Sequence, residues 1–406
     1  MNGASIRILA GLVLGLTAGA LLAGTEAGVA AGRLAQPVGR LWLDALTMTV
    51  VPLVFSLLVT GVIGAAGHAA GGRIAARALW WFALLLLAAS LLAVPVTLLV
   101  LQLSPLPPAA ASLAAAGGPA PAVGGSDWLA NIIPTNVIKS AADTAMVPIV
   151  VFALLFGIAA TRIEDELRSQ IDRTFRAVAQ IMLVIVRWVL WIAPLGVLAL
   201  AYTVGLRLGG GAAGVLVHYV MVVVIACLAT VVMTYGWAAL FGRIGPLAFA
   251  RAALPPQIIA VSTQSSLASL PAMVDAAEPL GIDRSGAGVV LPLAVSLFRA
   301  ASAAANVAVA IYLAHVHGVA LGPWALVLGA VVAATVSVAA VGLPAQVSFF
   351  AVIAPVCLAM GVPVVLLPLL LAIETLPDIF RTLGNVTADL AVARIVGRSD
   401  GAADPA

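Results

Sequence analysis

Five polar residues near the C-terminal end of the chain recur at the spacing of one helix face. They follow one another at intervals of four, three, four and four, and about 100° per residue places them on a single stripe: Glu374, Asp378, Arg381, Asn385 and Asp389. Such charges are ordinary on a soluble helix, and a solvated helix is one interpretation. Within a membrane each charge costs about 2.5–3.5 kcal/mol, so such groups usually face a bundle interior or a substrate path.

The composition selects the second interpretation. Of 406 residues, 63% are hydrophobic and only 9% are charged, against about 25% charged in soluble domains. Mean hydropathy is +1.19, so we expect an all-α polytopic membrane protein. A net charge of +3 is too small to suggest a nucleic-acid partner. The two cysteines lie in apolar runs and the four histidines show no ligand spacing, so we assign no cofactor and no metal. The first apolar run, from residue 6, predicts a retained helix rather than a signal peptide.

Apolar stretches of spanning length fill the first part of the chain. They cover 6–31, 41–66, 75–103, 145–161, 177–206 and 214–242. Residues 104–127, rich in Pro, Gly and Ala, predict a flexible extramembrane linker. The charge-rich run 161–176 predicts a solvated connector. With the N-terminus placed inside, most Lys and Arg residues fall on the cytoplasmic side, which predicts that both termini are cytoplasmic.

Two later stretches are each interrupted halfway by small, polar or proline residues. Residues 246–280 contain Pro255-Pro256 and the tip Ser262–Ser266, and residues 322–358 contain Gly342-Leu343-Pro344. Each apolar half is too short to span, which predicts a re-entrant helical hairpin, with a kinked span as the alternative. Each hairpin precedes a helix with polar groups, so the unit occurs twice. Two units entering from opposite faces would form an inverted repeat whose tips meet near the midplane and hold a ligand.

Four stretches together resemble the dicarboxylate/amino acid:cation symporter family, which has the glutamate-transporter fold. Residues 131–136, Asn-Ile-Ile-Pro-Thr-Asn, resemble the segment before the fourth helix. Ser265 and Ser266 resemble the tip of hairpin 1, and Gly342 lies in the resembling tip of hairpin 2. The last helix matches the pattern Asp-x-x-Arg-Thr-x-x-Asn-Val-Thr-x-Asp throughout, from Asp378 to Asp389.

This resemblance implies eight transmembrane helices plus two re-entrant hairpins, assembled as a homotrimer in the bacterial cytoplasmic (inner) membrane. It implies a scaffold, a transport unit that moves like an elevator, and a cytoplasmic tail. The scaffold would comprise 1–74 and 128–206, the transport unit 75–103 and 207–397, the linker 104–127 and the tail 398–406.

The resemblance also assigns roles in binding an acidic amino acid. Arg381 would take the side-chain carboxylate, since its planar fork binds a carboxylate bidentately. Asp378 would pair with the α-amino group, and Asn385 would take the α-carboxylate. Thr382, Ser265, Ser266 and Gly342 would complete the site. Family members that carry C4-dicarboxylates lack an aspartate at the position of Asp378. A mutual salt bridge of Asp378 and Arg381, and a plain serine-lined turn, are the structural alternatives.

One segment departs from the family pattern. Sodium-coupled members break the seventh helix at Asn-Met-Asp-Gly-Thr, which supplies sodium ligands, but here the aligned residues are Phe298-Arg299-Ala300-Ala301-Ser302. Asp389, a sodium ligand in those relatives, remains. We expect Arg299 to replace the bound cation by neutralising Asp389 or approaching Asp378, although it could instead snorkel to water. Glu374, Asp378 and Asp389 are candidate proton carriers, since burial favours a neutral carboxyl and a nearby arginine favours an ionised one.

These observations predict a secondary transporter of aspartate or glutamate, not an enzyme. Transport would be sodium-independent and either proton-coupled or uncoupled, with membrane lipid as its surroundings. A C4-dicarboxylate symporter is the alternative within the class. A substrate-gated anion channel or a transport-dead sensor is the alternative outside it.

Overall fold

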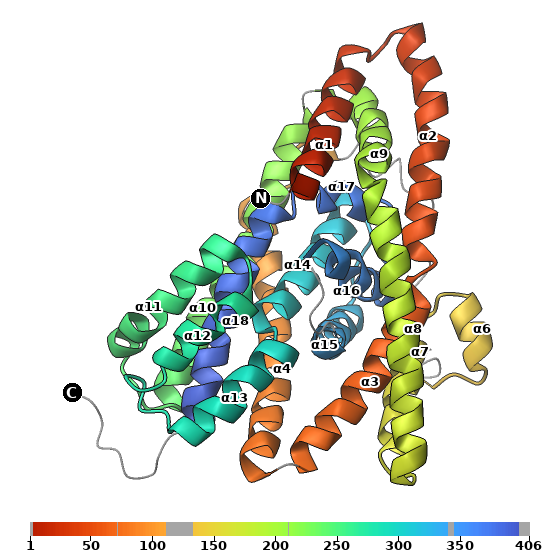
Figure 1. Ribbon diagram of the computed structural model, residues 1–406. Helices are drawn as coiled ribbons and strands as arrows, with labels where there is room; N and C mark the ends of the chain where they lie inside the picture. The colour runs from red at the N-terminus through yellow and green to blue at the C-terminus, as the bar shows by residue number, and fades with distance from the viewer. Residues whose placement is uncertain (1–2, 71, 111–132, 210, 340–344, 398–406) are drawn as a thin grey trace.

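The computed structural model describes residues 3–70, 72–110, 133–209, 211–339 and 345–397. Within these ranges the chain is built from helices and turns and contains no β-strand (Figure 1). The prediction of an all-helical fold is therefore confirmed for the described residues. Gly342, most of the linker 104–127 and the tail 398–406 lie outside the described residues.

Helices of 5 to 31 residues follow one another along the described chain. They are α1 (Gly3–Leu21), α2 (Glu26–Thr47), α3 (Val50–Ala70), α4 (Arg73–Leu103), α6 (Val137–Ala142), α7 (Met146–Ala160), α8 (Asp165–Trp191), α9 (Ala193–Leu208), α10 (Gly211–Leu240), α11 (Pro246–Thr263), α12 (Ser266–Asp275), α13 (Arg284–Leu297), α14 (Ala300–Val316), α15 (Pro323–Ala339), α16 (Ala345–Ala359), α17 (Leu367–Leu371) and α18 (Thr375–Gly397).

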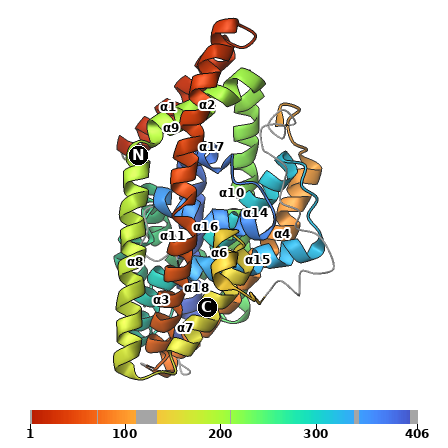
Figure 2. The ribbon, with the colours of Figure 1, turned by 90° about the vertical axis from the view of Figure 1, so that its right-hand side faces the viewer.

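Five helical stretches of the described chain are long and apolar enough to cross a membrane. Four of them correspond to α4, α8, α10 and the pair α13–α14, and the fifth runs through α2 and α3 over residues 26–68. Figure 2 shows α2 and α3 following one another down the molecule. Several shorter apolar helices accompany them, among them α1, α7 and α9. The predicted count of eight transmembrane helices stays a prediction.

The structure differs from several of the predicted boundaries. The span predicted over 177–206 is divided between α8, which ends at Trp191, and α9, which begins at Ala193. Two further differences have local causes. The run predicted as one span over 6–31 is divided, because Thr25 caps a new helix by accepting a hydrogen bond from Gly28 N–H at 3.0 Å. The predicted connector 161–176 instead forms the first turns of α8. Ion pairs of Arg168 with Asp165 (2.7 Å) and Arg176 with Asp172 (2.8 Å) lie along that helix at spacings that stabilise it.

The helices pack into two groups. At one end α1 and α2 pack against α9, and α3 packs against α7 and α8. The second group surrounds α14, which contacts α4, α10, α15, α16 and α18 and is almost completely buried. The two groups meet where α3 contacts α4, α15 and α16, where α7 and α8 contact α16, and where α9 contacts α10 and α17. The expected division into scaffold and transport unit follows similar lines, and it stays a prediction.

Both proposed hairpin regions contain two helices that pack against each other: α11 with α12, and α15 with α16. The first turn lies at Gln264 and Ser265, and the second lies outside the described residues. The hairpin helices α11 and α12 also pack on α18. The last helix therefore lies between hairpin 1, α10, α13 and α14, as Figure 1 shows.

The C-terminal end of α18 is tied to two neighbouring segments by one buried arginine. Arg394 Nε donates to the carbonyl of Gly242, and Nη1 donates to the carbonyl of Gly281, both at 2.9 Å. Gly281 has a φ of +61°, and a Cβ there would lie 2.7 Å from Arg394 Nη1. The backbone N–H of Asp283 also donates to the carbonyl of Gly397 at 3.0 Å. This end of α18 is thus joined to the segments that follow α10 and α12.

Candidate functional site

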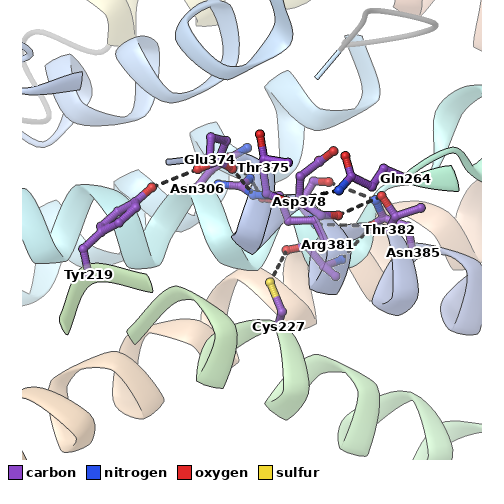
Figure 3. A network of polar contacts seen from close by, with 12 residues as sticks. Tyr219, Cys227, Gln264, Asn306, Glu374, Thr375, Asp378, Arg381, Thr382 and Asn385 are labelled. Atoms are coloured by element: carbon purple, nitrogen blue, oxygen red, sulfur yellow. Dashed lines mark hydrogen bonds and ion pairs between the residues drawn. The ribbon is translucent and has the colours of Figure 1, made fainter. Parts of the chain in front are cut away.

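Arg381 is the centre of a buried polar network on α18 (Figure 3). Its side chain is 6% exposed. Nε lies 2.7 Å from Glu374 Oε1, an ion pair that is not aligned as a hydrogen bond. Nη1 donates to Asn306 Oδ1 on α14 at 2.8 Å, and its contact with the Ser302 carbonyl is longer, at 3.5 Å. Nη2 is buried and has no hydrogen-bond partner among the described residues. A buried guanidinium with one unused amino group is suited to receiving the carboxylate of a ligand.

Glu374 lies in the turn that joins α17 to α18 and is 4% exposed. One of its oxygens faces Arg381, and the other accepts a hydrogen bond from Tyr219 on α10 at 3.0 Å. Arg381 was predicted to pair with a carboxylate of the substrate. In this structure it pairs instead with a carboxylate of the protein itself, that of Glu374. Asp378, the residue considered as its salt-bridge partner in the structural alternative, is partly exposed and does not lie within 4.0 Å of it.

Asn385, one turn after Arg381, is engaged with the start of α14. Its Oδ1 accepts from the backbone N–H groups of Ala301 (3.0 Å) and Ser302 (3.2 Å). Its Nδ2 donates to Ser302 Oγ at 2.9 Å. The first N–H groups of a helix have no hydrogen-bond acceptors within that helix, so Asn385 on α18 supplies an acceptor for two of them. The nearby Thr382 hydroxyl donates to the carbonyl of Asp378 at 2.9 Å.

Arg299 lies in the break between α13 and α14, with φ −135° and ψ 65°, after Phe298 in the extended conformation. Asp378 and Asp389 are the carboxylates with which it interacts electrostatically. Neither carboxylate lies within 4.0 Å of it. Asp389 is completely buried, and neither of its oxygens has a hydrogen-bond partner in the described part of the chain. An isolated buried carboxylate is costly, so the longer-range field of Arg299 is the compensation that the structure offers.

The tip of hairpin 1 lies against the start of α18. Gln264 adopts a left-handed conformation, with φ 53° and ψ 35°, and its Nε2 donates to the Thr375 carbonyl at 3.3 Å. The Ser265 hydroxyl caps α12 by accepting from the Ala268 N–H at 3.2 Å, which is the structural role left open for this serine. Ser266 begins α12 beside it. Gly342, proposed for the second tip, is outside the described residues.

The family of the chain follows from a comparison with known protein families. Residues 4–399 match the model of the sodium:dicarboxylate symporter family. The chain belongs to this family. The resemblance seen in the motifs is confirmed, and the protein is a multi-pass membrane transporter, not an enzyme.

Relatives in the family are distant but cover nearly the whole chain. The proton/glutamate-aspartate symporter of Escherichia coli (strain K12) is 25% identical over 373 residues, which are 89% of this chain and 85% of that protein. The proton/sodium-glutamate symport protein of Bacillus subtilis (strain 168) is 25% identical over 414 residues, 100% and 94% of the two chains. A C4-dicarboxylate transport protein of Azorhizobium caulinodans is 24% identical over 408 residues, 97% and 89%. These names place the chain among dicarboxylate and amino-acid symporters.

Sequence reasoning missed three members of the buried network. Tyr219 is one polar group in a long apolar run, Asn306 is an amide in a helix of Ala and Val, and Gln264 lies in a serine-rich turn. Only Asn306 gave a usable signal, because an amide within an otherwise apolar membrane helix needs a hydrogen-bonding partner. Its Oδ1 accepts from Arg381 Nη1, and its Nδ2 is buried without a partner in the described chain.

Proposed function

We propose that this symporter carries acidic amino acids, aspartate or glutamate, and that Arg381 binds one of their carboxylates. The observation that carries this proposal is the buried guanidinium with Nη2 unused. Asp378 lies one turn earlier and stays partly exposed, so an ammonium group could reach it. The name of the Escherichia coli relative, a proton/glutamate-aspartate symporter, supports the same substrate class.

We infer further that transport needs no sodium, and that Arg299 supplies the positive charge that a bound cation would supply. The support is chemical. Sodium prefers several hard oxygen ligands, and the aligned asparagine and aspartate are replaced by Phe298 and Ala300. The positive field of Arg299 at the Asp389 carboxylate opposes a second cation there. Transport is then either coupled to protons or uncoupled. By family resemblance, the protein is a homotrimeric elevator in the bacterial cytoplasmic membrane.

A C4-dicarboxylate is the second candidate substrate. It is favoured by the names of several relatives, such as the Azorhizobium caulinodans protein. A dicarboxylate has no ammonium, so Asp378 would have to be neutral or find another partner. The comparison of aspartate with succinate therefore tests whether Asp378 takes part in binding.

The experiment is uptake of radiolabelled aspartate into proteoliposomes containing the purified full-length protein. A proton gradient and a sodium gradient are imposed separately, choline replaces sodium, and unlabelled aspartate and succinate compete. We expect saturable uptake that changes less than about twofold in half-saturating concentration when choline replaces sodium, which is less than about 0.4 kcal/mol. A steep dependence on sodium would refute the role assigned to Arg299. Stronger competition by succinate than by aspartate would favour the dicarboxylate. Binding with neither uptake nor counterflow would favour a channel or sensor.

A further inference from the structure

We propose that Glu374 is the proton acceptor of this transporter, and that its protonation releases Arg381 to the carboxylate of the substrate. The inference rests on the proposed function and assigns the coupling proton to one of its three candidate carboxylates. It starts from an observation that the motifs did not predict: the guanidinium expected to hold the substrate is already paired with the chain's own Glu374 at 2.7 Å.

Glu374 and a substrate carboxylate are competitors for one guanidinium. With Nη1 directed at Asn306, the substrate can use Nη2 and the Nε edge that Glu374 now faces. Two parallel N–H···O bonds need both. If Glu374 stayed ionised, two carboxylates would then share one buried cation, and like charges at such a site disfavour each other strongly. Taking up a proton turns Glu374 into a neutral carboxyl that can give up the ion pair. Tyr219 remains next to it as a polar partner on α10.

The charges around Glu374 determine how many protons must bind together with the substrate to keep the net charge of the site unchanged. Several charged and titratable groups lie around Glu374 and its two partners, Tyr219 and Arg381. They are Cys227 on α10, Tyr312 on α14, Arg299 at the start of α14, and Asp378 and Asp389 on α18. Two arginines against three carboxylates leave one net negative charge. An acidic amino acid adds another, and one proton on Glu374 restores the original charge of this largely dehydrated site.

The same reasoning separates the two substrate classes. A fully ionised dicarboxylate adds two negative charges, so one proton on Glu374 does not restore the charge of the site. It also lacks the ammonium that would neutralise Asp378. A second proton, bound to Asp378, would both restore the charge of the site and neutralise Asp378. The number of protons bound with each ligand is therefore predicted as about one for aspartate and about two for succinate.

Asp389, another of the three candidate carboxylates, is less suited to this exchange. Asp389 is completely buried, two turns beyond Arg381 on α18, and forms no hydrogen bond in the described chain. Binding of a carboxylate at Arg381 does not displace any partner of Asp389, since it has none there to lose. Glu374 differs because the ligand displaces it from Arg381 and the proton removes its charge, so both change the same Glu374–Arg381 ion pair.

The test counts protons taken up when ligand binds to the purified full-length protein. Aspartate and succinate are titrated by calorimetry, at one pH, in buffers of different ionisation enthalpy. The wild type should take up about one proton with aspartate, and Glu374→Gln about none. With succinate, the wild type should take up about two protons and Glu374→Gln about one. Glu278→Gln is the matched control, since Glu278 is exposed near the end of hairpin 1, and it should behave as the wild type.

A second measurement covers the case in which Glu374→Gln does not fold. The infrared difference spectrum of the wild type on adding aspartate should show a new protonated-carboxyl band, which is also present in Glu278→Gln. Absence of this band in the wild type, or uptake of a proton with aspartate that persists in Glu374→Gln and is lost in Asp389→Asn, would overturn the assignment. Failure of aspartate, glutamate and succinate to bind the wild type at all would instead remove the proposed function, and this inference with it.

Discussion

Ser302 and Asn385 are hydrogen-bonded to each other twice. The Ser302 N–H donates to Asn385 Oδ1 at 3.2 Å, and Asn385 Nδ2 donates to Ser302 Oγ at 2.9 Å. The break before α14 is therefore held against α18 by a side chain that was expected to bind substrate. If Asn385 takes the α-carboxylate of an amino acid, Ser302 Oγ and the ligand compete for the same N–H group.

The first prediction follows from this competition. Ser302→Ala should leave Asn385 Nδ2 available and tighten aspartate binding severalfold, because a net hydrogen bond is worth about 0.5–1.5 kcal/mol. The measurement is the dissociation constant by calorimetry. Ser296→Ala is the control, since that exposed hydroxyl donates to the Pro292 carbonyl on α13. An unchanged dissociation constant in Ser302→Ala would show that the ligand does not use Asn385 Nδ2.

The second prediction concerns the fork of Arg381. Arg381→Lys keeps the positive charge beside Glu374 but cannot present two parallel donors. Loss of one charge-assisted hydrogen bond costs about 1.5–3 kcal/mol, so aspartate should bind at least about tenfold more weakly. Arg187→Lys, at an exposed position on α8, serves as the control. Uptake by Arg381→Lys equal to that of the wild type would exclude bidentate recognition.

The third prediction treats Arg299 and Asp389 as a coupled pair. Asp389→Asn alone should lower stability or transport, because it removes a negative charge that offsets the partly buried Arg299. Arg299→Met should be worse, since it leaves the completely buried Asp389 without the compensating field of Arg299. The double variant should recover part of the loss in thermal stability in detergent. Strictly additive effects of the two changes would show that the residues are independent.

The fourth prediction concerns how closely α18 approaches α14. A Cβ on Gly384 would lie 2.5 Å from the Cβ of Ala301, so Gly384→Ala should separate the helices that carry Arg381 and Asn306. Overpacking of this kind costs about 1–3 kcal/mol and should lower the thermal midpoint. Gly236→Ala, on α10, is the control because its added Cβ meets no atom within 4 Å. Equal stability of the two variants would contradict the packing described for α14 and α18.

The polar stripe of α18 is largely buried: Arg381, Asn385 and Asp389 are enclosed and Glu374 joins them from the preceding turn, whereas Asp378 is partly exposed. Every residue from Gly384 to Gly397 is buried, so this burial comes from the helices that surround α18 and not from its 3.6-residue period. The helix break expected around Phe298 and Arg299 is present, since α13 ends at Leu297 and α14 begins at Ala300. Local sequence could not predict which groups would pair. Tyr219 and Glu374 are 155 positions apart, and only the packing of α10 against α18 brings them together.

Helix boundaries were less predictable for a related reason. The charged run at 161–176 looked like a loop because hydropathy alone separates spans from connectors. Its side chains pair along α8, so the helix extends beyond its apolar part. Capping by Thr25 likewise divides an apolar run that is continuous in hydropathy.

The arginine near the end of the last helix bears on how this molecule can change shape. Arg394 fastens α18 to the carbonyls of Gly242 and Gly281. If, as proposed, Arg381 is carried from one aqueous compartment to the other, these two flanking loops must move together with α18. A covalent cross-link placed among the three segments should therefore leave turnover intact.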